Sequence, residues 1–167
     1  MKLEIERKFL IKSVPEIKPD QIVEIEQYYF KNDTGIWERA RSWSPNNSKK
    51  KYIHTIKKTV SKGVNIEDEH ELSKKEFSTF KEKCHKTSNE SKYIKKTRHI
   101  YKDGILKWEI DEFNWDCNLI IAEIEIPTKD YLVIIPEFLK DLILLEVTGL
   151  KPFSNRSLAS KIKKSPV

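Results

Sequence analysis

The sequence contains little cysteine and no long apolar run, and both absences narrow the class of protein. Its two cysteines, Cys84 and Cys117, stand far apart, without a C-x-x-C pair or a histidine at zinc-ligand spacing. Reduced, structural thiols are therefore expected rather than a disulfide framework or a zinc site. No apolar run approaches the length of a membrane-spanning helix, and the first residues include no apolar signal region. We therefore expect a cytoplasmic protein without a membrane partner.

Apolar residues are also fewer, and charged residues more frequent, than in typical domains. The apolar residues make up 38% of the 167 residues and charged residues make up 35%, so the chain is poorer in core-forming side chains than typical domains. Four Trp, six Tyr and seven Phe nevertheless recur along patterned segments, which argues against disorder. A single domain over residues 1–167 with a polar interior would explain this balance. The net charge of +6 indicates an anionic partner.

A strict alternation of apolar and charged residues begins at residues 3–10, LEIERKFL. Read with a period of two, Glu4, Glu6 and Lys8 share one face of a strand, opposite the apolar residues. Patterned segments of the same kind follow, separated by turn signals, and we expect strands at 22–30, 36–43, 52–60, 64–72, 91–102, 105–113 and 118–126.

Helical signals are few. Ser73 and Glu76 have the spacing of a capping box and precede a helical apolar stripe, which predicts one helix between the strand segments. Shorter helices are expected at 136–142 and, after a cap at Ser154 or Asn155, as far as Ile162. The whole pattern predicts a mainly β (α+β) fold, an eight-stranded antiparallel closed barrel with a few peripheral helices.

The charged faces of the expected strands sort by sign. The acidic pairs are Glu4/Glu6 and Glu123/Glu125, and the basic pairs are Arg39/Arg41 and Lys96/Arg98. On solvent-exposed faces such pairs would contribute little. Inside a barrel, the clustered carboxylates would repel one another unless a cation compensated them, and the arginines would need an anion. A metal-bound polyphosphate would satisfy both groups.

The pattern EIERKF, with Glu4, Glu6 and Lys8, resembles the E-x-E-x-K signature of the CYTH superfamily, the triphosphate tunnel metalloenzymes. The resemblance continues in order at Gln27-Tyr28-Tyr29, Arg39-x-Arg41, Ile56-Lys57, Glu69-x-Glu71, Lys96-x-Arg98, residues 108–113, Glu123-x-Glu125, Val147-Thr148-Gly149, Asn155 and Leu158-Ala159. Short bacterial inorganic tripolyphosphatases are the members it resembles. One departure is that Glu67 and Asp68 stand where many members have a basic residue, which leaves the roles of Glu69 and Glu71 open.

The resemblance implies a tunnel that binds a triphosphate and uses Mg²⁺ or Mn²⁺, both of which accept oxygen ligands. The metal set expected on this basis is Glu4, Glu6, Asp111, Glu123 and Glu125. The substrate-binding set is Lys8, Arg39, Arg41, Lys57, Lys96 and Arg98, to which Glu69 and Glu71 are added. The catalytic set is Glu4, Glu6, Lys8, Lys57 and Asp111. A metal-oriented water would attack the terminal phosphorus.

Other functions remain open at this stage. Class IV adenylyl cyclases and thiamine triphosphatases share the tunnel, although the sequence lacks the early His-Phe pair typical of the cyclases. A non-enzymatic module that binds polyphosphate or nucleic acid would gain nothing from several carboxylates on its binding surface, so we do not expect a nucleic-acid partner. The expected partner is a small triphosphate, and the sequence leaves homodimer formation open.

Overall fold

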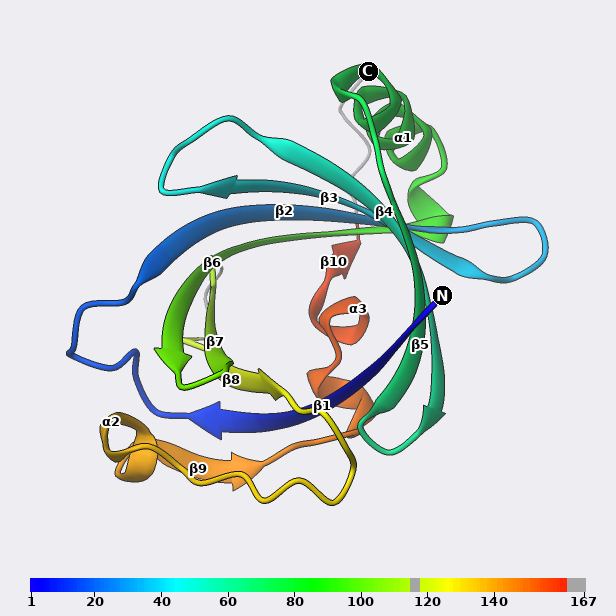
Figure 1. Cartoon of the computed structure of the whole chain (residues 1–167). Helices are drawn as coiled ribbons and strands as arrows, with labels where there is room; N and C mark the ends of the chain where they lie inside the picture. The colour runs from blue at the N-terminus through cyan, green and yellow to red at the C-terminus, as the bar shows by residue number, and fades with distance from the viewer. Residues whose placement is uncertain (115–117, 162–167) are drawn as a thin grey trace.

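A closed ring of antiparallel strands dominates the structure, a computed structural model that describes residues 1–114 and 118–161 (Figure 1). Within these residues, eight strands pair in the order β1–β5–β4–β3–β2–β6–β7–β8, and β8 pairs again with β1. Their bounds are β1 Lys2–Ile11, β2 Gln21–Lys31, β3 Trp37–Pro45, β4 Lys51–Ser61, β5 Val64–Glu71, β6 Ser91–Asp103, β7 Leu106–Phe113 and β8 Ile120–Glu125. The predicted eight-stranded antiparallel closed barrel is confirmed.

Short elements surround the barrel. They are α1 Lys74–Lys86, η1 Ser88–Glu90, α2 Glu137–Lys140, β9 Ile143–Glu146, η2 Lys151–Phe153, α3 Asn155–Leu158 and β10 Ser160–Lys161. Strand β9 pairs with β1 beside the barrel, and β10 pairs with β6. Figure 1 shows α1 and α2 outside the ring of strands and α3 within its outline. No helix of the described chain has both the length and the apolar character needed to cross a bilayer.

The last helix is shorter than the sequence predicts. It ends at Leu158, and Ala159 has extended backbone angles of φ −65° and ψ 132°. Ser160 then pairs with Tyr93 on a part of β6 that lies beyond its pairing with β7, which begins at Lys96. Free backbone groups on β6 thus outweigh the helical pattern of the sequence. Ile162, the predicted end of this helix, lies outside the described residues, as does Cys117.

Two apolar clusters lie on the outer face of the barrel wall, and two others, which include Tyr29 and Ile25, lie on the inner face beside the cavities. One cluster joins β1, β7 and β8 to α2 through residues that include Phe9, Trp108 and Leu139. A second packs Tyr28 of β2 against Phe77 of α1. Because successive strand residues face opposite sides, the outer face is mainly apolar and the inner face carries the charged residues together with the two inner apolar clusters. This arrangement explains how a chain with few apolar residues stabilises a closed barrel.

Helix α1 begins as the sequence predicts. The Ser73 side chain accepts a hydrogen bond from the Glu76 amide at 3.2 Å, and the Glu76 carboxylate accepts one from the Ser73 amide at 2.7 Å. This reciprocal capping box satisfies two backbone donors that a helix N-terminus otherwise leaves free. Phe77 and Cys84 are buried on the face that packs against the barrel. The helix therefore shields the outer face of the neighbouring strands.

The β4–β5 turn docks on β1 through Gly63. The Glu6 amide donates a hydrogen bond to the Gly63 carbonyl at 2.8 Å, and Gly63 has a φ of +70°. A Cβ atom at this position would lie 2.7 Å from the Glu6 carbonyl oxygen and 2.8 Å from the Thr148 side chain. The turn residue therefore needs both a left-handed backbone and the absence of a side chain.

We expect Gly63→Ala to lower the free energy of unfolding by about 3 kcal/mol, because it combines backbone strain with overlap against β1. Gly104→Ala is the matched control, since Gly104 also has positive φ (+61°) but open space around it. Its expected loss is about 1 kcal/mol, from the left-handed backbone alone. Urea denaturation measures both values. Equal losses in the two variants would contradict the close approach at Gly63.

Candidate active site

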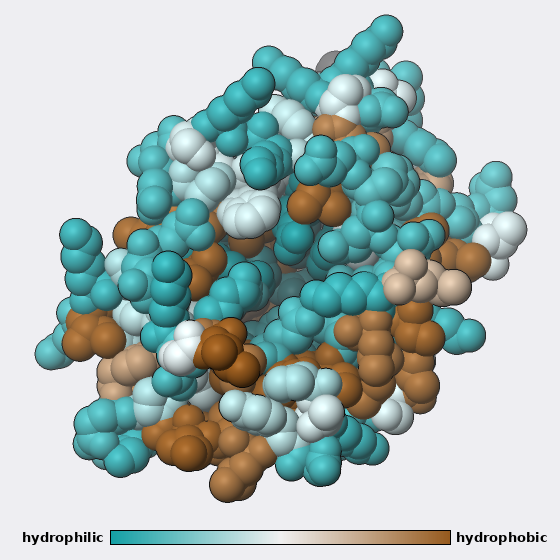
Figure 2. All heavy atoms as spheres, in the orientation of Figure 1, coloured by the Kyte–Doolittle hydropathy of each residue, from teal (hydrophilic) through white to brown (hydrophobic). Residues whose placement is uncertain are grey.

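The barrel encloses a charged lumen. Figure 2 shows hydrophilic residues around a hollow at the centre of this face of the molecule. Two cavities occupy the interior, and we name them by their walls. The C-terminal cavity, of about 310 Å³, includes Val147 and Gly149 in its lining, and the arginine cavity, of about 270 Å³, includes Arg41 and Arg98. Both cavities reach the centre of the barrel, where a shared set of side chains lies: Arg39, Lys57 and Asn155.

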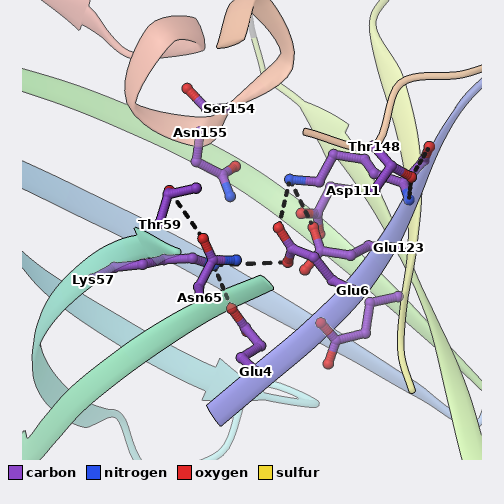
Figure 3. Close-up of polar contacts among 12 residues, drawn as sticks. Glu4, Glu6, Lys57, Thr59, Asn65, Asp111, Glu123, Thr148, Ser154 and Asn155 are labelled. Carbon is purple, nitrogen blue, oxygen red and sulfur yellow. Dashed lines mark hydrogen bonds and ion pairs between the residues drawn. The ribbon is translucent and has the colours of Figure 1, made fainter. Parts of the chain in front are cut away.

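Three carboxylates meet in the lumen. Oxygen atoms of Glu4, Glu6 and Glu123 lie within 4.8 Å of one another, and we call this group the acidic cluster (Figure 3). Glu4 and Glu6 project from the same face of β1, since they are two residues apart. Pairing of Lys8 with Glu123 in the β1–β8 register brings β8 to the same place. The strand register therefore brings together side chains that are far apart in the sequence.

Two lysines partly compensate the acidic cluster. Lys57 Nζ forms a close ion pair with Glu4 and lies 3.7 Å from a Glu6 oxygen. Lys8 Nζ lies 3.2 Å from Glu123 and 3.6 Å from Glu6. Burial would lower the pKa of Lys57, but the charges of Glu6, Glu4 and Glu123 outweigh it and raise the pKa. Both lysines are therefore charged, and they lie within the group of carboxylates.

The carboxylates of the cluster differ in proton affinity. Burial, followed by the charge of Glu123, raises the pKa of Glu6 to about 8. Burial also raises the pKa of Glu4. For Glu123 burial acts in the same direction, but Lys8, Arg98 and Lys57 overcome it and hold the pKa well below its usual range. Within the described residues, the buried Oε2 atom of Glu6 has no hydrogen-bond partner. Its nearest cation is Lys57 Nζ at 3.7 Å, beyond hydrogen-bond distance, so this oxygen is a suitable ligand for a divalent cation.

A cationic group faces the arginine cavity. Arg39 and Arg41 come from β3 and Arg98 from β6, and the Nε atoms of Arg39 and Arg41 are buried without a hydrogen-bond partner among the described residues. Burial, then the charges of Arg39 and Arg98, lowers the pKa of Arg41 to about 10. Within the described chain, Arg41 forms no ion pair, whereas Arg39 donates to Thr55 at 2.9 Å and pairs with Glu69 at 3.4 Å. Unpaired guanidinium donors in a cavity favour an anion with several oxygen atoms.

Asp111 lies in a different environment from the acidic cluster. Lys96 Nζ donates to its Oδ2 atom at 2.5 Å, and Arg98 donates to its two oxygens at 2.7 and 2.9 Å. Arg98 also forms a close ion pair with Glu109. Burial would raise the pKa of Asp111, but Arg98 and Lys96 lower it. The structure therefore places Asp111 where it orients Lys96 and Arg98, with both oxygens already occupied.

The remaining predicted residues lie near the opening of the lumen or outside it. Glu125 pairs with Lys2 at 2.7 Å and is 45% exposed, and it lines the arginine cavity without joining the acidic cluster. Glu69 lines the same cavity, where it accepts a hydrogen bond from Thr55 at 2.9 Å. Glu71 is exposed and lines neither of the two cavities described above. The structure thus brings Glu69 toward the site but leaves Glu71 outside.

Neutral polar residues in the lumen were missing from the predicted site. Thr55, Thr59 and Asn65 line the C-terminal cavity, and Thr59 donates a hydrogen bond to Asn65 at 3.0 Å. The period-two pattern contains a usable signal, since Thr55 and Thr59 flank Lys57 on the same strand face. Asn155 lines both cavities, although it belongs to a short helix rather than to a strand. Strand periodicity carries no information about such a residue.

A closed antiparallel barrel with carboxylates and cations in its lumen is the architecture of the triphosphate tunnel fold. Residues 2–156 match the CYTH domain, and the chain therefore belongs to the CYTH domain family. Comparison with curated proteins gave no match.

Similar solved structures include the inorganic triphosphatase NE1496, with 25% identity, 97% of each chain covered and a TM-score of 0.60. PH1012 of Pyrococcus horikoshii OT3 is 24% identical over 76% of this chain and 80% of that chain, with a TM-score of 0.52. The Schizosaccharomyces pombe Mediator head module is 10% identical over 77% and 84%, also with a TM-score of 0.52. The last two similarities concern the fold alone.

The metal-free protein is expected to lose stability as the pH rises from about 4.5 to about 8. The pKa of Glu6 is raised from 4.5 to about 8 in the folded state, so the folded state binds more protons in this window. The free energy of unfolding changes with pH in proportion to the number of protons bound by the unfolded state minus the number bound by the folded state. It therefore decreases as the pH rises through this window. We expect a loss of about 4 kcal/mol over this window, since each pH unit between the two pKa values contributes about 1.4 kcal/mol.

Glu6→Gln should remove most of this pH dependence, whereas Glu16→Gln, at an exposed position outside the barrel wall, should retain it. Urea denaturation in EDTA at pH 5 and pH 8 measures the effect. An identical slope in wild type and Glu6→Gln would show that Glu6 does not hold the proton.

Proposed function

We propose that this protein is a divalent-metal-dependent hydrolase of inorganic tripolyphosphate. The observation that carries the proposal is a pair of unmet electrostatic needs in one lumen. On one side, Glu6 has a buried oxygen without a hydrogen-bond partner among the described residues. On the other, Arg39 and Arg41 have buried donors that are equally unmet. A metal-bound polyanion supplies both the cation and the acceptor oxygens.

The acidic cluster is the proposed metal site. Glu4, Glu6 and Glu123 offer carboxylate oxygens close enough to share one ion, and oxygen donors suit Mg²⁺ or Mn²⁺. When bound, the ion would neutralise phosphate charge and lower the pKa of a bound water. Asp111 supports the site indirectly in this proposal, since it holds Lys96 and Arg98 in place. Glu125 pairs with Lys2 and lies outside this group of three carboxylates, so the proposal does not assign it to the ion.

The cations of the lumen would bind and orient the phosphates. Arg39, Arg41 and Arg98 would bind oxygens in the arginine cavity, and Lys8 and Lys57 would bind oxygens beside the carboxylates. Within the described residues, no histidine or cysteine lines either cavity, so water is the proposed nucleophile. Catalysis of phosphoryl transfer depends mainly on such positioning and on charge stabilisation.

Two observations favour inorganic tripolyphosphate as the substrate. The arginine cavity, of about 270 Å³, is smaller than the roughly 300–1,000 Å³ typical of pockets for drug-sized ligands, which suits a compact polyanion. The similar structure NE1496 is an inorganic triphosphatase and is covered over 97% of its chain. The second candidate is an organic triphosphate, because Tyr29 and Trp37 line the adjoining C-terminal cavity and offer surfaces for an organic group.

Phosphate release from tripolyphosphate is expected to require Mg²⁺ or Mn²⁺ and to exceed release from ATP or thiamine triphosphate. Excess EDTA should reduce the rate by a hundredfold or more, because metal ligation contributes several kcal/mol to the transition state. The measurement is phosphate release from each compound, together with an assay for cyclic AMP. Full activity in EDTA would contradict the metal site, and cyclic AMP as the main product would favour a cyclase.

Lys57→Ala is expected to lower kcat/KM for tripolyphosphate. The loss corresponds to about 1.5–3 kcal/mol of transition-state stabilisation, the contribution of a charged hydrogen bond. Lys58→Ala is the matched control, because the two lysines are adjacent on β4 and project to opposite faces. Its kcat/KM should stay within twofold of the wild-type value. Equal effects of the two substitutions would mean that net charge matters and that the lumen position of Lys57 does not.

A further inference from the structure

Asn155 is a lumen residue that the proposed mechanism does not use. It is the first residue of α3, and together with Arg39 and Lys57 it lines both cavities. In Figure 3 its side chain extends from α3 toward the lumen. The residue therefore lies where a ligand that spans the two cavities would pass.

The amide of Asn155 has a defined orientation. Lys96 Nζ lies 3.1 Å from Asn155 Oδ1 and 2.5 Å from Asp111 Oδ2. An ammonium group has donors and no acceptor, so the Asn155 atom that faces it must be the oxygen. The amide nitrogen, Nδ2, then faces away from Lys96. Among the described residues, Nδ2 donates to no protein group. The Asn155 side chain, whose oxygen is held by Lys96, thus presents two donor hydrogens to the cavities.

We propose that Asn155 is a substrate-binding residue that donates from Nδ2 to a phosphoryl oxygen of the triphosphate. The proposal rests on the proposed function and extends it to a residue outside the barrel strands. The charged neighbours that share both cavities, Arg39 and Lys57, are cations, so a ligand at this point is an anion with acceptor oxygens. A neutral donor adds a hydrogen bond without adding to the repulsion among the cations.

Asn155→Asp separates this role from a structural one. The substitution keeps an oxygen that accepts from Lys96, but it replaces the two donors with a negatively charged acceptor. We expect KM for tripolyphosphate to rise about a hundredfold at saturating Mg²⁺, because a hydrogen bond is lost and a like charge is added. Asn155→Ala, which removes the amide without adding charge, should raise KM about tenfold.

The control for the change in net charge is Asn47→Asp, in the exposed β3–β4 connection, which should leave KM unchanged. Melting curves without ligand check the fold, and Asn155→Asp should melt no lower than wild type because its new charge faces Lys96.

An unchanged KM in Asn155→Asp overturns the proposal. So does a loss confined to kcat, which would make Asn155 a positioning residue for Lys96. Failure of the proposed function has a different signature, since wild type itself would then neither bind nor hydrolyse tripolyphosphate, and both proposals would fall. An active wild type with the expected increases in KM supports both.

Discussion

Mutual compensation of opposite charges inside a closed barrel is the constraint on which the rest of the structure depends. Removing charges from water is costly unless partners and hydrogen bonds compensate them. The protein meets most of this cost internally: Lys8 and Lys57 face the acidic cluster, and Asp111 holds Lys96 and Arg98. Hydrogen bonding is nevertheless incomplete at Glu6, Arg39 and Arg41, each of which has one buried polar atom without a hydrogen-bond partner among the described residues. The remaining imbalance has the sign and shape that a metal-bound polyanion would correct.

Packing on the outer face of the barrel wall stabilises a fold whose inner face carries charged residues. Apolar residues on the outer face pack against α1, α2 and β9, and they contribute hydrophobic stabilisation together with two smaller clusters on the inner face. Ladder hydrogen bonds close the ring without free edges between its eight strands. The inner face is thereby free to carry charges that serve binding. Gly63, which docks the β4–β5 turn beside Glu6, links the outer framework to the acidic cluster.

Much of the fold was predictable from the sequence because a strand pattern with a period of two assigns each side chain to a face. That pattern alone places Glu4, Glu6, Arg39 and Arg41 on inward faces once the barrel closes. It does not determine which charges become partners, since Arg98 meets Asp111 only through the β6–β7 register. The family resemblance carries no information on this pairing; it assigns Asp111 to the metal set, and that assignment stays a prediction. The end of α3 and the lumen position of Asn155 depend on tertiary pairing with β6, which local sequence does not reveal.

The most direct test of the account is a crystal structure of the protein in complex with Mn²⁺ and tripolyphosphate, prepared under conditions in which tripolyphosphate is cleaved slowly or not at all. Anomalous scattering is recorded at the manganese edge. The account predicts an anomalous peak within ligand distance of Glu4, Glu6 and Glu123, and phosphate density that contacts Arg39 and Arg41. Manganese or phosphate bound only on the outer surface of the barrel, with an empty lumen, would contradict the claim that the charged lumen forms the binding site.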